Sequence, residues 1–392
     1  MKKASLGKIL LACSLLISCL GCSFIEATPG DAQANDGAAA LPTSTPVFIS
    51  EYLETATPVP ATPDATSEQQ IVYGAWVPYW DYADAINEVD ELGDRLSDVV
   101  CFAAIFDAQD KPFLLPDMEE ALLCLNILYS EDHTIYLSVV NDIEIDDSVY
   151  ENKSAELLWR LLGSDEAIDA HIEDLMTMLR ESGAEGLEID YEAIQSDVDL
   201  WQRFVLFVER LYAQTQSEGY PLRVVLSWDA AKYATFPDGP QYSIMCYNLY
   251  GTHSGPGPKA DRSFLQKVFS VNRALPGRPV LAFATGGFDW CDDGSVVSLT
   301  QSAAVTLQID NGISADSVFR DNDSAVLYFT YYDEAGLLHE VWYADDETLA
   351  FWRSLALDAG YTNFDLFRLG GNSSVGLTEF FDLSSVSESD MG

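Results

Sequence analysis

Apolar and polar residues follow two alternating patterns from Ile71 onward. Short runs rich in β-branched and aromatic residues have the length of strands, and segments between them carry apolar residues at helical spacing. The predicted strands cover residues 71–77, 98–106, 134–140, 185–191, 222–228, 242–248, 280–285 and 364–369. Eight strands interleaved with helices are typical of the (β/α)8 TIM barrel, so we expect an α/β fold of that architecture.

The helix before the fourth predicted strand carries one apolar stripe, and Gly183 stands where it should end. The stripe is formed by Ile168, Ile172, Leu175, Met176 and Leu179. Residues 291–343 do not continue the alternation of strands and helices, and they include a strand-like run at 325–332. This pattern predicts a small α+β insertion after the seventh strand. We expect the barrel to occupy residues 70–380 and a flexible tail to occupy residues 381–392.

Residues 1–22 have the pattern of a lipoprotein-type signal peptide. Basic residues precede an apolar run, residues 9–18, that is too short to span a bilayer. The run ends in Leu16-Ile17-Ser18-Cys19, which resembles a lipobox, so Cys19, or else Cys22, is the candidate for lipidation. Residues 23–69, rich in Ala, Thr and Pro, predict a disordered tether. We therefore expect an extracytoplasmic protein that is lipid-anchored to the bacterial cell membrane, with an ordinary secretory signal as the alternative.

The charge of the chain narrows its possible partners. Lys and Arg number 20 against 63 Asp and Glu, which gives a formal net charge of −43. Such a surface repels phosphate backbones, so nucleic acid is excluded as a partner. Because 48% of the residues are hydrophobic, the acidity belongs to the surface of a folded body rather than to a disordered chain.

Four cysteines follow the signal segment, at Cys101, Cys124, Cys246 and Cys291. In an oxidising compartment these cysteines can form disulfides, and the sequence does not determine which of them pair. Cys101 and Cys246 lie in apolar strand-like runs, where buried free thiols are the alternative to a disulfide. The spacing of the four matches no metal site, and we expect neither a metal nor another cofactor.

Acids and apolar residues alternate through the fourth predicted strand. Glu188, Asp190 and Glu192 are separated by Ile189 and Tyr191, and side chains two apart in a strand share one face. In a closed parallel barrel this face points to the axis, and the last acid lies at the C-terminal rim, where barrel active sites are found. The alternatives are an exposed edge strand and a calcium site, although no loop shows the regular oxygen spacing of the latter.

Neighbouring carboxylates raise one another's pKa, so the outermost can stay protonated near neutral pH while an inner one is charged. A glycosidase needs one protonated carboxyl group as its general acid beside another that is charged. The sequence contains no G-x-S-x-G, zincin or Rossmann motif that would indicate a competing chemistry.

The acidic segment resembles the DxxDxDxE signature of glycoside hydrolase family 18, the chitinase-like family, and is closest to its spore-cortex and cell-wall branch. Met245-Cys246-Tyr247-Asn248 resembles the M-x-Y-D motif of the sixth strand in that family. Further matches follow in the same order at 287–290, 339–342 and 367–370. The resemblance covers about residues 71–372.

The resemblance implies a retaining, substrate-assisted mechanism. Glu192 would protonate the glycosidic oxygen and then act as the base toward water. Asp190 would orient the 2-acetamido group of the substrate, whose carbonyl oxygen attacks the anomeric carbon, and Tyr247 would hydrogen-bond the same group. Glu188, Glu185 and Asn248 would support these residues. The candidates for contact with sugar rings are Trp76, Tyr79, Trp80, Met245, Trp342 and Phe367, of which the last two are as easily explained as core residues.

Four positions depart from the pattern of the family. Glu185 and Glu188 replace aspartates, Asn248 replaces an aspartate, and Phe367 stands where tryptophan is common. The two glutamates each bring an extra methylene into a crowded barrel. These departures are expected to affect the rate, the pH optimum or the choice of substrate.

We therefore expect a monomeric glycosidase of the chitinase or endo-β-N-acetylglucosaminidase type, which acts on β-1,4 bonds at N-acetylglucosamine in chitin-like or cell-wall polysaccharides. The alternative is a catalytically weak or inactive glycan-binding protein. Chitin, peptidoglycan and N-glycan cores all stay open as substrates, and so do endo and exo action. The acidic surface favours neutral chains over wall fragments rich in carboxylates.

Overall fold

The computed structural model describes residues 71–146, 149–194, 197–372 and 377–382. Eight parallel strands form a barrel in the order β2-β1-β15-β9-β8-β7-β6-β4, and pairing of β2 with β4 closes the ring. They are β1 (Val72–Pro78), β2 (Asp98–Phe106), β4 (Thr134–Asp146), β6 (Gly186–Asp190), β7 (Leu222–Leu226), β8 (Gln241–Met245), β9 (Val280–Ala284) and β15 (Asn363–Phe367). The predicted TIM barrel is confirmed. The predicted signal peptide, the tether and most of the predicted tail lie outside the described residues.

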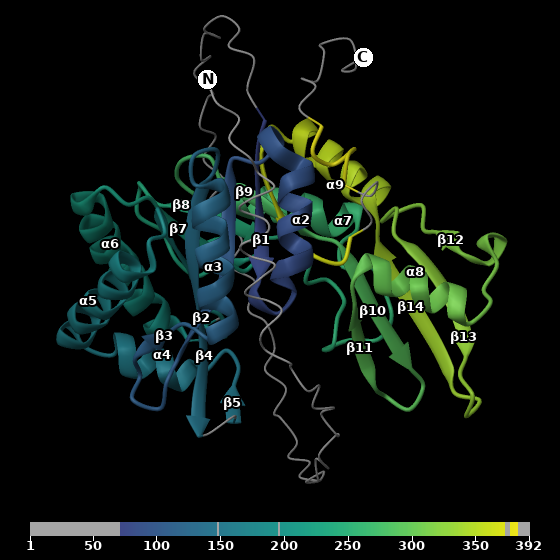
Figure 1. Ribbon diagram of the computed structural model, residues 1–392, viewed down its shortest axis with the longest axis horizontal. Coiled ribbons are helices and arrows are strands. Elements are labelled where there is room, and N and C mark those ends of the chain that lie inside the picture. Colours follow the sequence, from purple (N-terminus) through teal and green to yellow (C-terminus); the bar gives the residue numbers. More distant parts are fainter. Residues whose placement is uncertain (1–70, 147–148, 195–196, 373–376, 383–392) are drawn as a thin grey trace, which may run out of the picture. The chain divides into compact units, whose positions relative to one another are not determined.

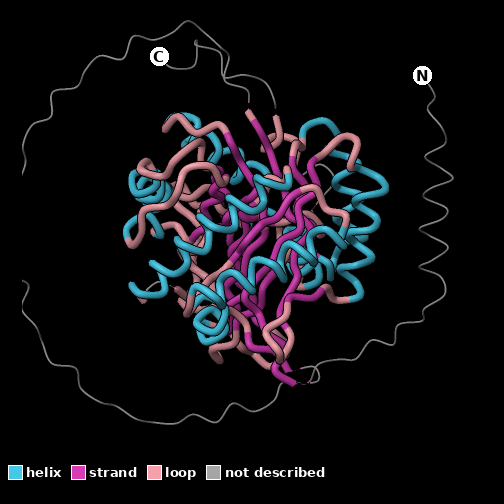
Figure 2. The backbone as a smooth tube through the Cα atoms, turned by 90° about the vertical axis from the view of Figure 1, so that its left-hand side faces the viewer, coloured by secondary structure: helices cyan, strands magenta, loops and turns pink. Residues whose placement is uncertain are grey.

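Helices cover the outside of the barrel (Figure 2). They are α2 (Tyr82–Leu92), α3 (Pro116–Tyr129), α4 (Ala155–Leu162), α5 (Asp165–Ser182), α6 (Val198–Glu218), α7 (Arg262–Asn272) and α9 (Asp346–Asp358). The predicted helix before the fourth strand is α5. Its N-terminus is capped by Ser164, whose Oγ accepts from Ala167 N at 3.1 Å, and Gly183 ends it with a φ of 73°. The predicted apolar stripe of α5 is buried against the barrel core.

A second, antiparallel sheet lies beside the barrel and follows β9 in the chain (Figure 1). Its strands, in the order β11-β10-β14-β13-β12, are β10 (Gly286–Cys291), β11 (Val296–Leu299), β12 (Phe319–Arg320), β13 (Leu327–Tyr332) and β14 (Leu338–Ala344). Helix α8 (Gln301–Asp310) packs its Ala304 with Phe329 and Val341 on one face. The insertion occurs where it was predicted, but its sheet begins at Gly286 rather than Cys291, because β10 pairs with β14 along its whole length.

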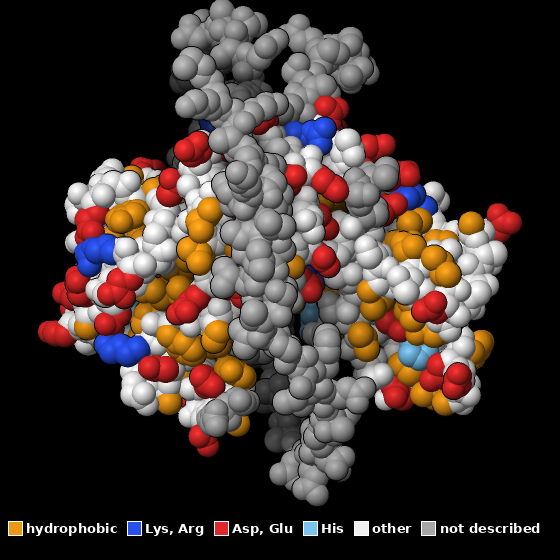
Figure 3. All heavy atoms as spheres, in the orientation of Figure 1, with side chains coloured by type: hydrophobic (Ala, Val, Ile, Leu, Met, Phe, Trp, Pro, Cys, Tyr) orange, Lys and Arg blue, Asp and Glu red, His pale blue; other side chains and the backbone are white. Residues whose placement is uncertain are grey.

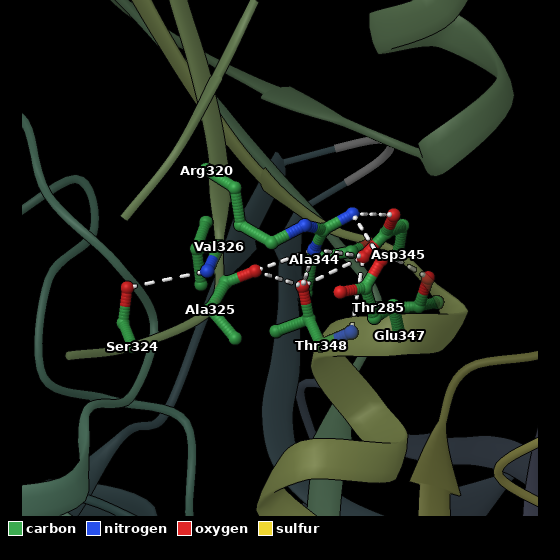
Figure 4. A network of polar contacts seen from close by, with 9 residues as sticks. All are labelled: Thr285, Arg320, Ser324, Ala325, Val326, Ala344, Asp345, Glu347 and Thr348. Atoms are coloured by element: carbon green, nitrogen blue, oxygen red, sulfur yellow. Dashed lines mark hydrogen bonds and ion pairs between the residues drawn. The ribbon is translucent and has the colours of Figure 1, made fainter. Parts of the chain in front are cut away.

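A polar network joins the insertion to the barrel (Figure 4). The Arg320 guanidinium donates to both carboxylate oxygens of Asp345, which caps α9, at 2.9 and 2.7 Å. Arg320 and Thr348 also donate to the carbonyl of Ala325, at 2.6 and 2.8 Å. At the end of β9, Thr285 Oγ1 donates to the carbonyl of Ala344 at 3.4 Å. A two-pronged guanidinium–carboxylate contact favours one geometry, so this network fixes the insertion near the C-terminal ends of the barrel strands.

Acidic side chains are spread over the face of the molecule in Figure 3, and basic ones are few there, in keeping with the charge of the sequence. Across the part of the chain that the structure describes, none of the helices combines the length and the apolar character needed to cross a membrane.

Cys101 and Cys246 are buried free thiols, and burial raises the pKa of Cys101 to about 12. Among the described residues, the structure contains no group of three or more His, Cys, Asp or Glu side chains that could hold a metal ion.

Candidate active site

Strand β6 carries two acids into the barrel. Leu187 and Ile189 are fully buried in the core between the strands and the helices, so the alternate side chains of Glu188 and Asp190 point to the barrel axis. Glu192 follows the strand at the C-terminal rim, with 18% of its side chain exposed. The three carboxyl groups are thus arranged from the barrel interior to its mouth.

Asp190 is buried, and its Oδ1 has no hydrogen-bond partner among the described residues. Burial, followed by the charges of Glu192 and Glu188, raises the pKa of Asp190 well above its ordinary value. The sequence predicts that the outermost acid holds the proton and an inner one is charged. In the structure the raised pKa belongs to the inner Asp190, which is buried, whereas Glu192 is partly exposed and pairs with Lys153.

A buried arginine on β7 binds three carboxylates inside the barrel. Arg223 Nε donates to Glu188 Oε2 at 3.0 Å, Nη1 donates to Asp98 Oδ2 at 3.2 Å, and Nη2 donates to Asp365 Oδ2. The other oxygen of Glu188 accepts from Trp76 Nε1 at 2.7 Å. Burial raises the pKa of Glu188 and of Asp98, and the charge of Arg223 opposes that rise. The extra methylene of Glu188 is therefore accommodated in a network that engages both oxygens of its carboxylate.

Glu192 is held both through its backbone and through its side chain. The Asn141 amide, on β4, accepts from Glu192 N at 2.8 Å and donates to Glu192 O at 3.1 Å. Lys153, which follows the short strand β5 (Val149–Glu151), places its Nζ 2.6 Å from Glu192 Oε1. The β4–β5 hairpin, which is distant from Glu192 in the sequence, therefore holds the backbone of this residue through Asn141 and its carboxylate through Lys153.

Aromatic side chains gather in the barrel interior near these acids. Trp76 and Met245 belong to one buried cluster, against which Tyr247 and Phe367 pack. The rings of Tyr247 and Phe367 are stacked, with centroids 5.7 Å apart and planes 13° apart. Burial, then the charges of Asp190 and Glu192, raise the pKa of Tyr247 well above its ordinary value, so its hydroxyl can donate a hydrogen bond at neutral pH. The structure brings these four predicted site residues together.

Three further predicted site residues are Trp80, Trp342 and Asn248. Trp80 is 48% exposed, and its ring meets the ring of Tyr79 edge-on at 5.0 Å. Trp342 stacks on Tyr328 at 4.5 Å, on the face of the insertion sheet that α8 does not cover. Asn248 is exposed, and its Nδ2 lies 3.7 Å from Met245 Sδ.

The position of Glu185 corrects its predicted supporting role. This residue is exposed and precedes β6, at the end of the barrel opposite to Glu192. Its Oε2 accepts from Ile135 N at 3.3 Å, near the start of β4. We therefore assign Glu185 to the strand-entry side of the barrel rather than to the site.

Sequence reasoning missed Arg223, Lys153, Asn141 and the ring of Phe102, which meets Phe367 edge-on at 5.7 Å. A signal for Arg223 was present, because a single arginine within the apolar strand 222–226 must find buried carboxylates if that strand belongs to a barrel. Lys153 and Asn141 carried no comparable signal, since they meet Glu192 only through the fold.

Asp190→Asn should remove a pH-dependent loss of stability. A carboxyl whose pKa is raised by folding stabilises the native state while protonated, and this contribution is lost as the pH rises from the ordinary aspartate pKa through the raised one. Asparagine cannot ionise, so between about pH 5 and about pH 8 its urea midpoint should fall less than that of the wild type. The exposed Asp132→Asn serves as the control and should follow the wild type. Equal pH dependence of Asp190→Asn and wild type would contradict the expectation.

Sequence comparison identifies relatives among glycosylases. No protein-family model matches the chain. YvbX of Bacillus subtilis, named an uncharacterised glycosylase, is 23% identical over 242 residues, which are 58% of this chain and 69% of YvbX. YdhD of the same species is 22% identical over 217 residues, and the match spans 50% of each protein.

Comparison with solved structures finds the same barrel. The spore cortex-lytic enzyme SleL of Bacillus cereus superposes with a TM-score of 0.66 at 16% identity, over 82% of this chain and 76% of SleL. A chitinase from Chromobacterium violaceum gives a TM-score of 0.64 at 19% identity, over 79% and 96% of the two chains. The chain therefore has the chitinase-like fold seen in glycoside hydrolase family 18, and its named sequence relatives include an uncharacterised glycosylase and a putative sporulation-specific glycosylase of Bacillus subtilis.

Proposed function

We propose that the chain is a retaining glycoside hydrolase that cleaves β-1,4 bonds at N-acetylglucosamine residues of chitin-like or cell-wall glycans. The supporting observation is the environment of Asp190, a buried carboxyl with an unpartnered oxygen between Glu188 and Glu192. Buried polar atoms are rarely left without a partner. The N–H of a substrate acetamido group would supply one, and the nearby hydroxyl of Tyr247 would hold the same group.

The geometry supports a substrate-assisted reaction. The reacting state has Glu192 protonated and Asp190 ionised. With the acetamido group held by Asp190 and Tyr247, its carbonyl oxygen attacks the anomeric carbon, the bond to the leaving oxygen breaks, and Glu192 gives its proton to that oxygen. Asp190 stabilises the positive charge on the oxazolinium ion that forms. Water then attacks the anomeric carbon while Glu192 accepts its proton, which regenerates both side chains and retains the configuration.

A panel of substrates tests the proposal. Chitin oligomers, peptidoglycan and an N-glycan core are incubated separately with the protein, and the products are identified by mass spectrometry. We expect products that end in N-acetylglucosamine, with the β configuration seen by NMR before mutarotation. Products of inverted configuration would contradict the substrate-assisted mechanism.

The second candidate function is glycan binding with little or no turnover. The ion pair between Lys153 and Glu192 favours this candidate, because it engages an oxygen of the proposed acid. Binding of an oligomer by the wild type without release of product would establish glycan binding in place of hydrolysis.

We also propose that the protein is lipid-anchored outside the cytoplasm, on the evidence of residues 1–22, which lie outside the described residues. Metabolic labelling with a clickable fatty acid tests this. Loss of the label in Cys19→Ser but not in Cys22→Ser would assign the lipid to Cys19, and an unlabelled wild type would refute the anchor.

A further inference from the structure

The proposed acid has a cation beside it that belongs to neither the signature nor the barrel core. Lys153 Nζ lies 2.6 Å from Glu192 Oε1, and 56% of the lysine side chain is exposed. Burial lowers the pKa of the Lys153 ammonium, but the charges of Glu192, Asp190 and Asp142 together hold it above the ordinary value. The lysine is therefore charged at neutral pH and can be reached from solvent at the mouth of the barrel.

The position of Lys153 is built into the backbone around it. The buried Asn141 amide contacts the backbone of Glu192 and also donates to the carbonyl of Ser154 at 3.2 Å. Asp142 Oδ1 accepts from the backbone N–H of Lys153 at 2.8 Å. Lys153 itself has a φ of 55°, a conformation that residues other than glycine seldom adopt unless surrounding contacts hold them there. The neighbouring residues Asn141 and Asp142 thus place the lysine and the acid together.

This ion pair conflicts with acid catalysis unless the substrate changes it. Glu192 must hold and then release a proton at the leaving oxygen, and it cannot do so while Lys153 engages its carboxylate. When a sugar enters, the ammonium must therefore be given another anion or be left without its partner. The leaving oxygen is O4 of the sugar on the reducing side of the bond, and the adjacent carbon of that sugar carries O3. A substituent on O3 is consequently one of the two groups of this sugar, with the hydroxymethyl group on C5, that lie beside the acid and its lysine.

We propose, on the basis of the function proposed above, that Lys153 binds a carboxylate carried on O3 of the leaving sugar, as in the 3-O-lactyl ether of muramic acid. The lactyl carboxylate takes the place of Glu192 at the ammonium, and the released Glu192 carboxylate takes up a proton from solvent, which it then gives to O4. The favoured bond then joins N-acetylglucosamine, on the non-reducing side, to a lactylated aminosugar. The net charge of −43 predicts the opposite preference for the surface as a whole, but Lys153 supplies a positive charge at the reacting bond.

A matched pair of oligosaccharides tests this assignment. Both alternate N-acetylglucosamine with muramic acid, and they differ only in whether the lactyl group is a free carboxylate or its neutral amide. The readout is the ratio of kcat/KM for the carboxylate to kcat/KM for the amide. Because hydrogen bonds to charged groups are worth more than neutral ones, we expect the wild type to favour the carboxylate by about tenfold. Lys153→Gln should bring the ratio close to unity, and Lys153→Arg should retain part of the preference.

Lys111→Gln is the matched control, because Lys111 has a similar exposure and a similar ion pair, with Asp174 at 2.7 Å, on the outside of the barrel. It should keep the wild-type ratio. A ratio that is the same in wild type and Lys153→Gln would overturn the assignment and show that the lysine merely neutralises the acidic site.

A binding experiment separates this inference from the proposed hydrolysis. In Glu192→Gln the lysine has lost its partner, so calorimetric titration should show tighter binding of the carboxylate than of the amide, with a difference that shrinks as salt rises and vanishes in the Glu192→Gln/Lys153→Gln double variant. Such binding without any wild-type cleavage would refute hydrolysis and retain the role of Lys153. Cleavage of both oligosaccharides at equal rates would refute the role of Lys153 and retain hydrolysis.

Discussion

Glu192→Gln should lower kcat on N-acetylglucosamine oligomers by about 10²–10⁴-fold, the contribution expected of a positioned general acid and base. Glutamine preserves the size of the side chain and the backbone contacts with Asn141, but it has no proton to give to the leaving oxygen and cannot accept one from water. The measurement is initial-rate hydrolysis of a defined oligomer, together with calorimetric binding of the same oligomer. We expect binding to persist while turnover is lost.

Glu209→Gln provides the control for this loss. Glu209 is an exposed acid on α6, so its replacement changes the net charge by the same amount without touching the site. The control should retain the wild-type rate. If Glu192→Gln also retained the wild-type rate, Glu192 would not be the general acid, and the proposed mechanism would be wrong.

Arg223→Met should destabilise the protein by about 3–5 kcal/mol, the usual cost of removing one partner from a buried ion pair. The guanidinium is fully buried and serves Glu188, Asp98 and Asp365 at once, so methionine leaves three carboxylates without their shared cation. The free energy of unfolding is measured by urea denaturation. Because the arginine stabilises the ionised carboxylates, the difference between wild type and variant should shrink as the pH falls.

Arg210→Met tests whether any lost ion pair would have this effect. Arg210 pairs with Asp165 and Asp169 on the outside of α5 and α6, where solvent screens the charges. Its loss should be far less costly. An equal loss for Arg223 and Arg210 would show that the buried network contributes no more than a surface pair.

Much of the fold follows from local pattern. Each barrel strand is a short apolar run, and α5 has a stripe at helical spacing, a serine cap and a terminal glycine, all of which act over a few residues. The order Glu188, Asp190, Glu192 also places acids on one side of a strand without reference to any other segment. The insertion was harder to delimit. Gly286 joins the second sheet only because Ala344, far along the chain, is its pairing partner.

The chemistry of the site depends on contacts that no local pattern contains. Trp76 and Glu188 are 112 positions apart, and Arg223 and Asp365 are 142 apart, yet each pair is hydrogen-bonded inside the barrel. Which acid holds the proton likewise depends on burial and on the partner that each carboxylate meets in space. The sequence by itself therefore determined the barrel and the row of acids, since hydrophobic periodicity and strand geometry are local. Only the tertiary structure decided that Arg223 supports Glu188, that Lys153 pairs with Glu192 and that Asp190 is buried with one oxygen unpartnered, because electrostatic energies depend on distances that closure of the barrel sets.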